Sequence, residues 1–349
     1  MPREVAEVPG VDLERLTAWM DQQGLGDGPI EHTSLIAGGT QNVLLRFTRA
    51  GRTYVLRRPP LHKRSNSDET MRREARVLAA LATSDVPHPA LIAANGELDT
   101  LGAAFYLMEP IDGFNPTVEL PEPHRSDPTV QRAMGLSMAD AIAALGRIDV
   151  EAAGLAGLGR PAGWLERQVD RWRSHLASYD AIEGYRGADL PGVEDVAAWL
   201  DERRPTDWSP GLIHGDFHFA NVLVRRDAGE LAAVVDWELT TIGDPLLDLG
   251  HLLATWPKNT AGGMAAVGGG LADLALPSPD ELVDRYADGS PRDVSHAGWY
   301  QVLACYRLGI ILEGTNARAD AGQAPRATGD LLHAHAVNLF EQALTLVNG

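Results

Sequence analysis

The sequence predicts an α+β protein of two lobes. Short strands and turns dominate the first part of the chain, whereas helical periodicity dominates from about residue 127 onward. Between these parts, a strand over residues 103–108 runs into a segment with Pro and Gly, where two lobes would hinge. We therefore expect a β-rich amino-terminal lobe over residues 1–110 and a mainly helical carboxy-terminal lobe over residues 111–349.

The amino-terminal lobe is predicted to begin with a helix and a β-hairpin. Apolar side chains three residues apart indicate an amphipathic helix over residues 11–22. Residues 42–48 and 53–58 read as strands, and the turn at Gly51 joins them. The loop before this hairpin includes Gly38, Gly39, Thr40 and Asn42. Its backbone could approach a phosphate closely, although paired glycines also occur in plain turns.

Two charged residues of this lobe are expected to pair. The predicted helix over residues 68–82 carries Glu74 on the same face as the apolar Met71 and Leu78. A carboxylate on a buried face needs a cation, and Arg57 at the end of the second hairpin strand is the natural partner. The alternative is that Glu74 is an exposed charge at the edge of the apolar stripe.

The most informative segment is HGDFHFAN, which contains Asp216 and ends at Asn221. A hairpin over residues 222–235 follows and delivers Asp236 back toward Asn221. Asp216 could accept the proton of an attacking hydroxyl, while the amide and the second carboxylate supply hard oxygen ligands for Mg²⁺. This spacing is typical of a nucleotide phosphoryl-transfer centre.

A nucleotide base would lie between the lobes. Val55 shares a strand face with Arg57, so it could cover an adenine ring. The backbone from Glu109 to Ile111 follows the strand that enters the hinge, and we expect it to contact the edge of the ring. A surface turn is the alternative for that segment.

Composition and charge restrict the partners. The net charge of −18 argues against a nucleic acid or an acidic membrane surface, although residues 49–76 are locally basic and suit a polyphosphate. The single cysteine, Cys305, excludes an intramolecular disulfide and reads as a packed thiol. We find no apolar run of signal-peptide or membrane-spanning length, so we expect a cytoplasmic protein.

Helices are predicted through most of the carboxy-terminal lobe. Asp127 and Pro128 begin a helix whose apolar side chains form a core stripe. Further helices are expected over residues 164–178, 193–203, 296–312 and 330–346. Residues 259–270 are rich in glycine and predict a mobile loop.

A metallophosphatase is a competing interpretation of the central segment. Asp216 and His218 form an Asp-x-His pair, and the run from Gly243 to Asp248 faintly resembles a second metal motif of that class. Such enzymes also need a Gly-Asn-His segment, which the sequence lacks. The phosphoryl-transfer interpretation is therefore preferred.

With these residues identified, the chain resembles the aminoglycoside phosphotransferase and choline kinase superfamily. The resemblance covers about residues 30–255 and is carried by HGDFHFANVL, VVDWE and GDPLLDL. The runs GGTQN, YVLRRPP and REARVLAAL are most similar to the branch that resembles the kinase domains fused to some acyl-CoA dehydrogenases. The resemblance implies a two-lobed protein-kinase-like fold, ATP and Mg²⁺ as cofactors, and phosphate transfer to a small-molecule hydroxyl.

The resemblance also assigns roles to single residues. It makes Asp216 the base, Asn221 and Asp236 the metal ligands, and Arg57 with Glu74 the pair that positions the phosphates. A cationic acceptor such as an aminoglycoside or choline would suit an acidic carboxy-terminal lobe. The branch instead implies hydroxyacyl compounds, including CoA thioesters, so the acceptor class stays open.

The remaining motif residues are expected to be mainly structural. His214 would support the catalytic loop, while Asp244 and Asp248 would shape the segment that follows the metal ligand. His218 either reaches the acceptor or packs. The path from Asp236 to this segment is only about eight residues, too short for the long segment on which protein kinases dock peptides. We therefore expect no protein substrate.

One residue departs from the family pattern. Arg57 stands where the family has a lysine, and a planar guanidinium places charge at a phosphate differently from a compact ammonium. A non-catalytic nucleotide-binding module is therefore the alternative function.

Overall fold

The computed structural model describes residues 8, 10–36, 42–257 and 270–349. Gly38, Gly39 and Thr40 of the predicted glycine loop lie outside the described residues. The predicted loop over residues 259–270 also lies outside them, apart from its last residue. These features therefore remain predictions.

The described part of the chain has the secondary structure of an α+β protein. The strands are β1 (Glu31–Leu35), β2 (Val43–Arg49), β3 (Arg52–Arg58), β4 (Leu91–Asn95), β5 (Phe105–Met108), β6 (Gly211–Ile213), β7 (Val222–Val224), β8 (Leu231–Val234) and β9 (Thr241–Gly243). The helices are α1 (Leu13–Gln22), α2 (Ser67–Leu81), α3 (Pro128–Gly146), α4 (Gln168–Ala177), α5 (Val193–Glu202), α6 (Leu246–Ala254), α7 (Pro279–Gly289), α8 (Ala297–Asp320) and α9 (Arg326–Asn348). Within these ranges, no helix is both long and apolar enough to cross a membrane.

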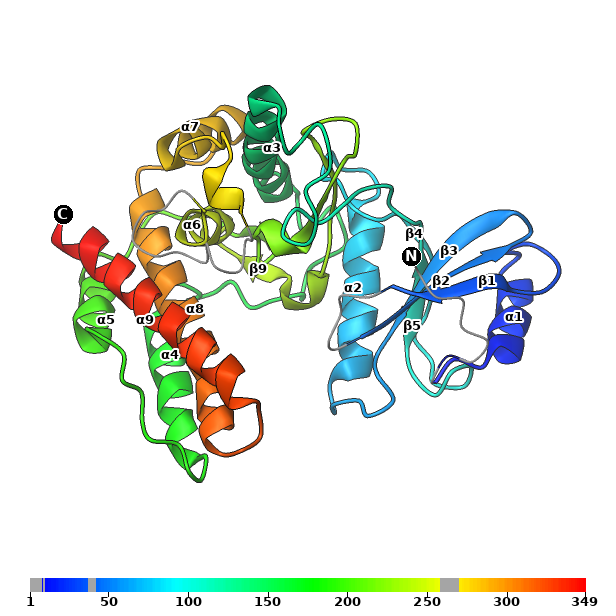
Figure 1. Cartoon of the computed structure of the whole chain (residues 1–349), viewed down its shortest axis with the longest axis horizontal. Helices are drawn as coiled ribbons and strands as arrows, with labels where there is room; N and C mark the ends of the chain where they lie inside the picture. The colour runs from blue at the N-terminus through cyan, green and yellow to red at the C-terminus, as the bar shows by residue number, and fades with distance from the viewer. Residues whose placement is uncertain (1–7, 9, 37–41, 258–269) are drawn as a thin grey trace.

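A five-stranded antiparallel sheet lies at one end of the molecule, flanked by α1 and α2 (Figure 1). Its strand order is β1-β2-β3-β5-β4. The predicted hairpin β2–β3 occupies the middle, in a register from Val43 opposite Arg58 to Arg49 opposite Arg52. The edge strands β1 and β4 were not predicted from the sequence periodicity.

Alternation along β3 gives the sheet two chemically different faces. Tyr54 and Leu56 pack with Leu16 and other apolar residues of α1 in one buried cluster. Val55 and Arg57 occupy the intervening positions, so their side chains leave the opposite face. That face looks toward α2 and the carboxy-terminal lobe.

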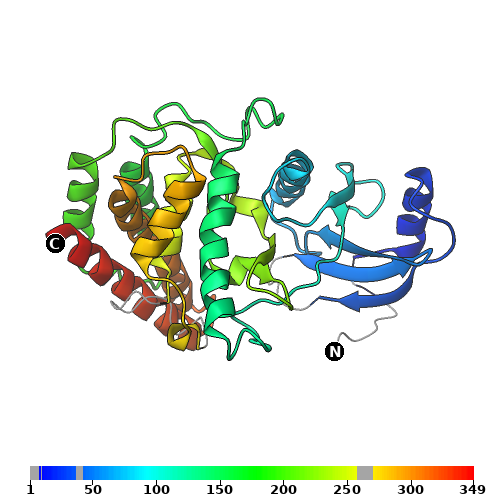
Figure 2. The ribbon, with the colours of Figure 1, turned by 90° about the horizontal axis from the view of Figure 1, so that it is seen from above.

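Helices make up the other end of the molecule, with α3 between the sheet and the carboxy-terminal helices (Figure 2). The helix predicted over residues 296–312 continues to Asp320 as α8, and most of α8 is buried. It packs against α6 and α9, with Cys305 fully enclosed. Burial raises the pKa of the Cys305 thiol, which agrees with the predicted packed role.

The larger hydrophobic core joins the two lobes. Val77 of α2 and Tyr106 of β5 belong to the same buried cluster as Met138 of α3 and Trp237. The inner face of the amino-terminal lobe is therefore completed by the carboxy-terminal lobe, whereas the α1 face has a separate core.

Two small antiparallel pairs hold the predicted catalytic segments. β6 pairs with β9, and β7 pairs with β8 as the sequence predicts. Between Asp236 and α6 the chain forms only a short 3-10 turn, Trp237–Leu239, and β9. The predicted short path after Asp236 is confirmed.

Candidate active site

The loop after β6 is fixed by close backbone packing. Gly215 has a φ of 86°, and a Cβ atom built there would lie 2.8 Å from the carbonyl oxygen of Leu239. A larger residue therefore requires both a strained backbone and a shifted neighbour. The Asp248 carboxylate accepts hydrogen bonds from the amides of His214 (2.7 Å) and Gly215 (2.9 Å). These contacts hold the backbone immediately before Asp216.

His214, Asp244 and Asp248 have the structural roles that the sequence predicts. A His214 ring nitrogen, Nε2, lies 3.0 Å from the carbonyl oxygen of Val235 and ties the loop to the end of β8. The Asp244 carboxylate accepts hydrogen bonds from an amide at the start of α6 and from the Tyr300 hydroxyl. The Arg307 guanidinium, which comes from α8, donates a hydrogen bond to the carbonyl of Gly215 and so also holds this loop.

Asn221 connects the predicted base to the predicted metal site. Its side-chain Nδ2 donates to the backbone oxygen of Asp216 at 2.9 Å and to its Oδ2 at 3.0 Å. Both partners are acceptors, so the amide oxygen is left for a cation. The Asn221 carbonyl accepts a 2.9 Å hydrogen bond from the amide of Val235, which places Asp236 next in the chain.

Asp236 has a left-handed backbone conformation, with φ 66° and ψ 62°. This conformation is uncommon outside glycine, although Asp adopts it more readily than most residues. It lies between β8 and the following 3-10 turn, and 41% of the side chain is exposed. The Asp236 carboxylate and the amide oxygen of Asn221 are both hard oxygen donors of the kind that Mg²⁺ prefers.

The predicted ion pair between Arg57 and Glu74 is present. Arg57 Nε lies 2.8 Å from Glu74 Oε2, and Arg57 Nη2 lies 2.8 Å from Asp236 Oδ1. Glu74 is 1% exposed and also accepts a 2.7 Å hydrogen bond from the Tyr106 hydroxyl. Burial alone would lower the pKa of Arg57, but the charges of Glu74 and its other partners raise that pKa, so the guanidinium stays charged.

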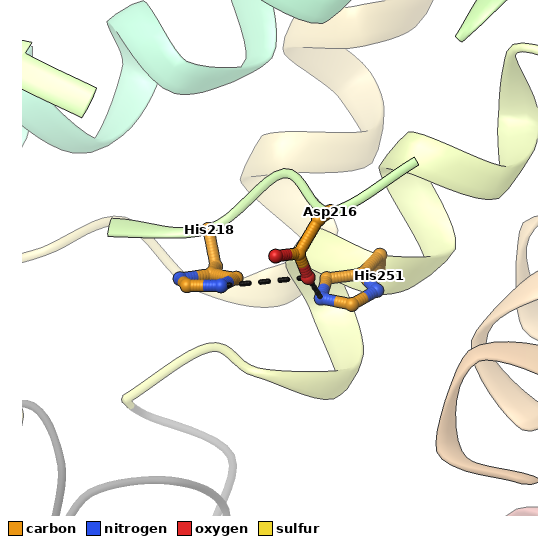
Figure 3. Close-up of side chains that lie close together, drawn as sticks. All are labelled: Asp216, His218 and His251. Atoms are coloured by element: carbon orange, nitrogen blue, oxygen red, sulfur yellow. Dashed lines mark ion pairs between the residues drawn. The ribbon is translucent and has the colours of Figure 1, made fainter. Parts of the chain in front are cut away.

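Asp216 is flanked by two histidines, as Figure 3 shows. The Nε2 atoms of His218 and His251 each lie 3.5 Å from Asp216 Oδ1. Burial alone would raise the pKa of Asp216, but His218, with smaller contributions from His251 and His214, holds that pKa well below its usual range. Asp216 is therefore ionised at neutral pH, as the predicted role of a base requires.

Part of the predicted nucleotide-binding set lies in the described residues. Val55, which is predicted to cover the adenine, is buried on β3, and Asn42 of the predicted phosphate loop directly precedes β2. The amide of Glu109 donates a 2.9 Å hydrogen bond to the carbonyl of Ala90, so that amide is already used. The carbonyl of Glu109 and the backbone of Ile111 are the hinge groups that we propose for the edge of the base.

Four further residues at the site were not predicted. Tyr106 lies in a predicted strand, but nothing local marks its contact with Glu74. Glu238 is part of the DWE run, where burial and then the charge of Asp236 raise its pKa. His251 and Arg307 come from helices distant in sequence, so only the docking of those helices could reveal them.

The chain matches the family model described as "Phosphotransferase enzyme family" over residues 32–282. This match spans well over half of the chain, and the chain belongs to that family. The family resemblance that HGDFHFANVL, VVDWE and GDPLLDL indicate is therefore confirmed. The metallophosphatase interpretation loses its support, because Asp244 and Asp248 are engaged in hydrogen bonds that shape the loop and α6.

Curated relatives are similar over most of this chain but are much longer. The chain is 30% identical over 339 residues to a probable acyl-CoA dehydrogenase of Arabidopsis thaliana, covering 91% of this chain and 39% of that protein. It is 28% identical over 318 residues to acyl-CoA dehydrogenase family member 11 of Homo sapiens, covering 88% and 39%. For family member 10 of Mus musculus, the match is 28% over 297 residues, covering 83% and 27%.

Solved structures share the fold. A putative aminoglycoside phosphotransferase from Ralstonia eutropha superimposes with a TM-score of 0.79 at 27% identity, covering 96% of this chain and 98% of that one. A thermostable mutant of aminoglycoside phosphotransferase APH(4)-Ia, in a ternary complex with ADP and hygromycin B, gives a TM-score of 0.58 at 15% identity, covering 93% and 97%. The predicted two-lobed kinase-like fold is confirmed.

Proposed function

We propose that this protein is an ATP- and Mg²⁺-dependent kinase that transfers the γ-phosphate of ATP to a hydroxyl group of a small molecule. The observation that supports this proposal best is the connected set Asp216, Asn221 and Asp236. One amide joins the base to the metal site, because Asn221 donates to Asp216 and keeps its oxygen for a cation.

The residues of this set fit Mg²⁺ chemically. The Asn221 amide oxygen and the Asp236 carboxylate are hard oxygen donors held on adjacent backbone segments. When bound, Mg²⁺ would neutralise charge on the ATP phosphates. Asp216 would hold the acceptor hydroxyl and accept its proton, at an oxygen that is ionised before the reaction begins.

Arg57 would supply the second positive charge for the phosphates. In this structure it spans Glu74 and Asp236, and the buried Glu74 and Tyr106 fix its direction. A nucleotide phosphate could then replace the Asp236 contact without loss of the Glu74 contact. This arrangement supports a catalytic role for arginine at a position where the family pattern has lysine.

For the acceptor, we propose a hydroxyacyl compound, free or as a CoA thioester. The relatives that match most of this chain at 28–30% identity are named acyl-CoA dehydrogenases. The structures bound to aminoglycoside or guanine nucleotide are only 15% identical and therefore support the fold alone. A small-molecule acceptor also agrees with the short path from Asp236 to α6, and we propose a cytoplasmic enzyme without protein or nucleic-acid substrates.

The test is phosphate transfer by the purified protein with Mg²⁺ and ATP. The acceptor panel contains hydroxyacyl-CoA thioesters, free hydroxy acids, choline-like amines and aminoglycosides, and mass spectrometry detects an ATP-dependent gain of phosphate. In the Asp216→Asn variant we expect the product to form at least about a hundredfold more slowly. ATP binding, measured by calorimetry, should persist because the metal ligands and Arg57 remain.

One result would favour a nucleotide-binding module without catalysis. The proposed kinase would be overturned by tight Mg²⁺-dependent ATP binding with no product from any acceptor, if ATP turnover by the wild type also does not exceed that of Asp216→Asn. Product formation that survives Asp216→Asn would instead remove Asp216 from its proposed role.

A further inference from the structure

A buried imidazole lies beside the proposed base. His251 is on α6, a helix whose residues are all buried, and is itself only 2% exposed. Among the described residues, neither of its ring nitrogens has a hydrogen-bond partner within normal distance. A polar ring in such a place costs folding free energy, so its position calls for a reason.

The ring is aimed at the proposed base. His251 Nε2 lies 3.5 Å from Asp216 Oδ1, and Figure 3 shows the two imidazole rings on either side of the carboxylate, each with a nitrogen turned toward it. The other oxygen, Oδ2, accepts the 3.0 Å hydrogen bond from Asn221. Contacts of this length at a catalytic group commonly shorten once substrate is bound.

The protons on both rings can be placed from their neighbours. His218 Nδ1 accepts a hydrogen bond from the amide of Ala220, so its proton is on Nε2, facing Asp216. Burial, opposed by the charge of Asp216, lowers the pKa of His251 to about 3, so that ring has one proton at neutral pH. Nε2 faces Asp216 Oδ1 at 3.5 Å, whereas the described residues give Nδ1 no partner, so we assign the proton to Nε2.

A metal ion is the competing explanation, because the ligand atoms of Asp216, His218 and His251 all lie within 4.8 Å of one another. A histidine that binds a metal normally donates its other ring N–H to an oxygen. Here His218 Nδ1 accepts instead of donating, and the described residues give His251 Nδ1 no oxygen partner. The surroundings therefore favour hydrogen bonds to the carboxylate.

We propose that His251 is a positioning residue for the kinase reaction, whose Nε2–H holds Asp216 Oδ1 from the buried side while His218 holds it from the more exposed side. The inference rests on the proposed function and deepens it. With Oδ2 bound to Asn221, both carboxylate oxygens are then restrained, and the hydroxyl meets a base of fixed orientation. Loss of that orientation lowers the rate without weakening nucleotide binding.

The test compares three substitutions that differ in where they place an N–H. In His251→Gln the side-chain amide reaches the position of Nε2, in His251→Asn it falls short, and His251→Leu has none. We expect Gln to keep kcat within about threefold, and Asn and Leu to lose about tenfold to a hundredfold, with the KM for ATP nearly unchanged. A purely structural role would instead rank the variants by melting temperature.

The chain offers a matched control in His335 of α9. It is also buried, at 5% exposure, and both of its ring nitrogens lack hydrogen-bond partners among the described residues. His335→Leu should therefore leave kcat unchanged. If His251→Leu also leaves kcat unchanged, or if Gln loses as much as Leu, the positioning role is wrong. In the second case, cobalt titration of chelator-treated protein tests for a metal site through visible absorption bands.

A measurement without turnover separates this inference from the proposed function. Nitrogen NMR of the histidine rings should show His251 with its proton on Nε2, and Asp216→Asn should shift that signal but not the signal of His335. If this shift is seen while no acceptor is phosphorylated, the contact exists and the proposed kinase reaction fails. If the proton is on Nδ1, the inference fails whatever the activity.

Discussion

At the scale of single residues, Arg57 has the widest influence on the site. Its guanidinium reaches Glu74 within the amino-terminal lobe and Asp236 from the carboxy-terminal lobe. A lysine has one compact ammonium and would hold two separated carboxylates less well. The arginine thus gives the buried glutamate a cationic partner and at the same time contacts Asp236, the predicted metal ligand.

Arg57→Ala should therefore destabilise the protein strongly. Glu74 would remain buried without its cation, which costs about 3–5 kcal/mol in the free energy of unfolding. Urea denaturation measures this change. Arg52→Ala on the same strand is the control, because its ion pair with Glu109 is half exposed and should contribute less than about 1 kcal/mol. Equal losses in the two variants would contradict the bridging role.

At the scale of elements, the sequence predicted those strands and helices that a local residue pattern determines. The β2–β3 hairpin, α2 with its inward Glu74, and the β7–β8 hairpin follow from alternation, helical spacing and turn residues. β1 and β4 were missed because edge strands pair on one side only and need little regular alternation. α7 was missed although its start has a readable signal, a capping box from Ser278 to Glu281 with Pro279 between them.

The site residues also divide into those that local sequence patterns predict and those that depend on the packing of distant elements. Asp216, Asn221 and Asp236 are joined by one loop and one hairpin, so their approach follows from short-range structure. The His251 contact depends on the docking of α6 against the loop after β6 and against α8. A sequence shows that α6 is apolar, but it does not show which residue of a wholly buried helix meets the carboxylate.

The close approach of α6 to α8 can be tested at one glycine. A Cβ atom on Gly250 would lie 2.4 Å from the backbone of Tyr300, so Gly250→Ala must push the helices apart. We expect a loss of about 1–3 kcal/mol in thermal or urea unfolding, and slower turnover because His251 is the next residue. Gly298→Ala on α8 is the matched control, since open space surrounds that position and alanine should stabilise the helix by about 0.5–1 kcal/mol. Gly250→Ala should lower the free energy of unfolding and Gly298→Ala should raise it, and changes of the same sign would contradict the close approach of α6 to α8.

At the scale of the whole molecule, the two lobes share a core, so we expect them to fold and unfold together. Val77 and Tyr106 from the amino-terminal lobe are buried in the same cluster as Met138 and Trp237 from the carboxy-terminal lobe. The separate cluster around α1 is small by comparison. Unfolding of one lobe would therefore expose a large apolar surface of the other, which makes a half-folded state unfavourable.

This predicts one cooperative unfolding transition seen by different probes. Of the eight tryptophans, Trp19 is the one in the α1 cluster, so the fluorescence difference between wild type and Trp19→Phe reports the amino-terminal lobe. We expect that difference to change at the same urea concentration as the far-ultraviolet circular dichroism, which is dominated by the carboxy-terminal helices. In Arg57→Ala both signals should shift to lower urea together, because the shared core still couples the lobes. A Trp19 signal that moves first would mean that the Arg57 bridge, and not the core, joins the lobes.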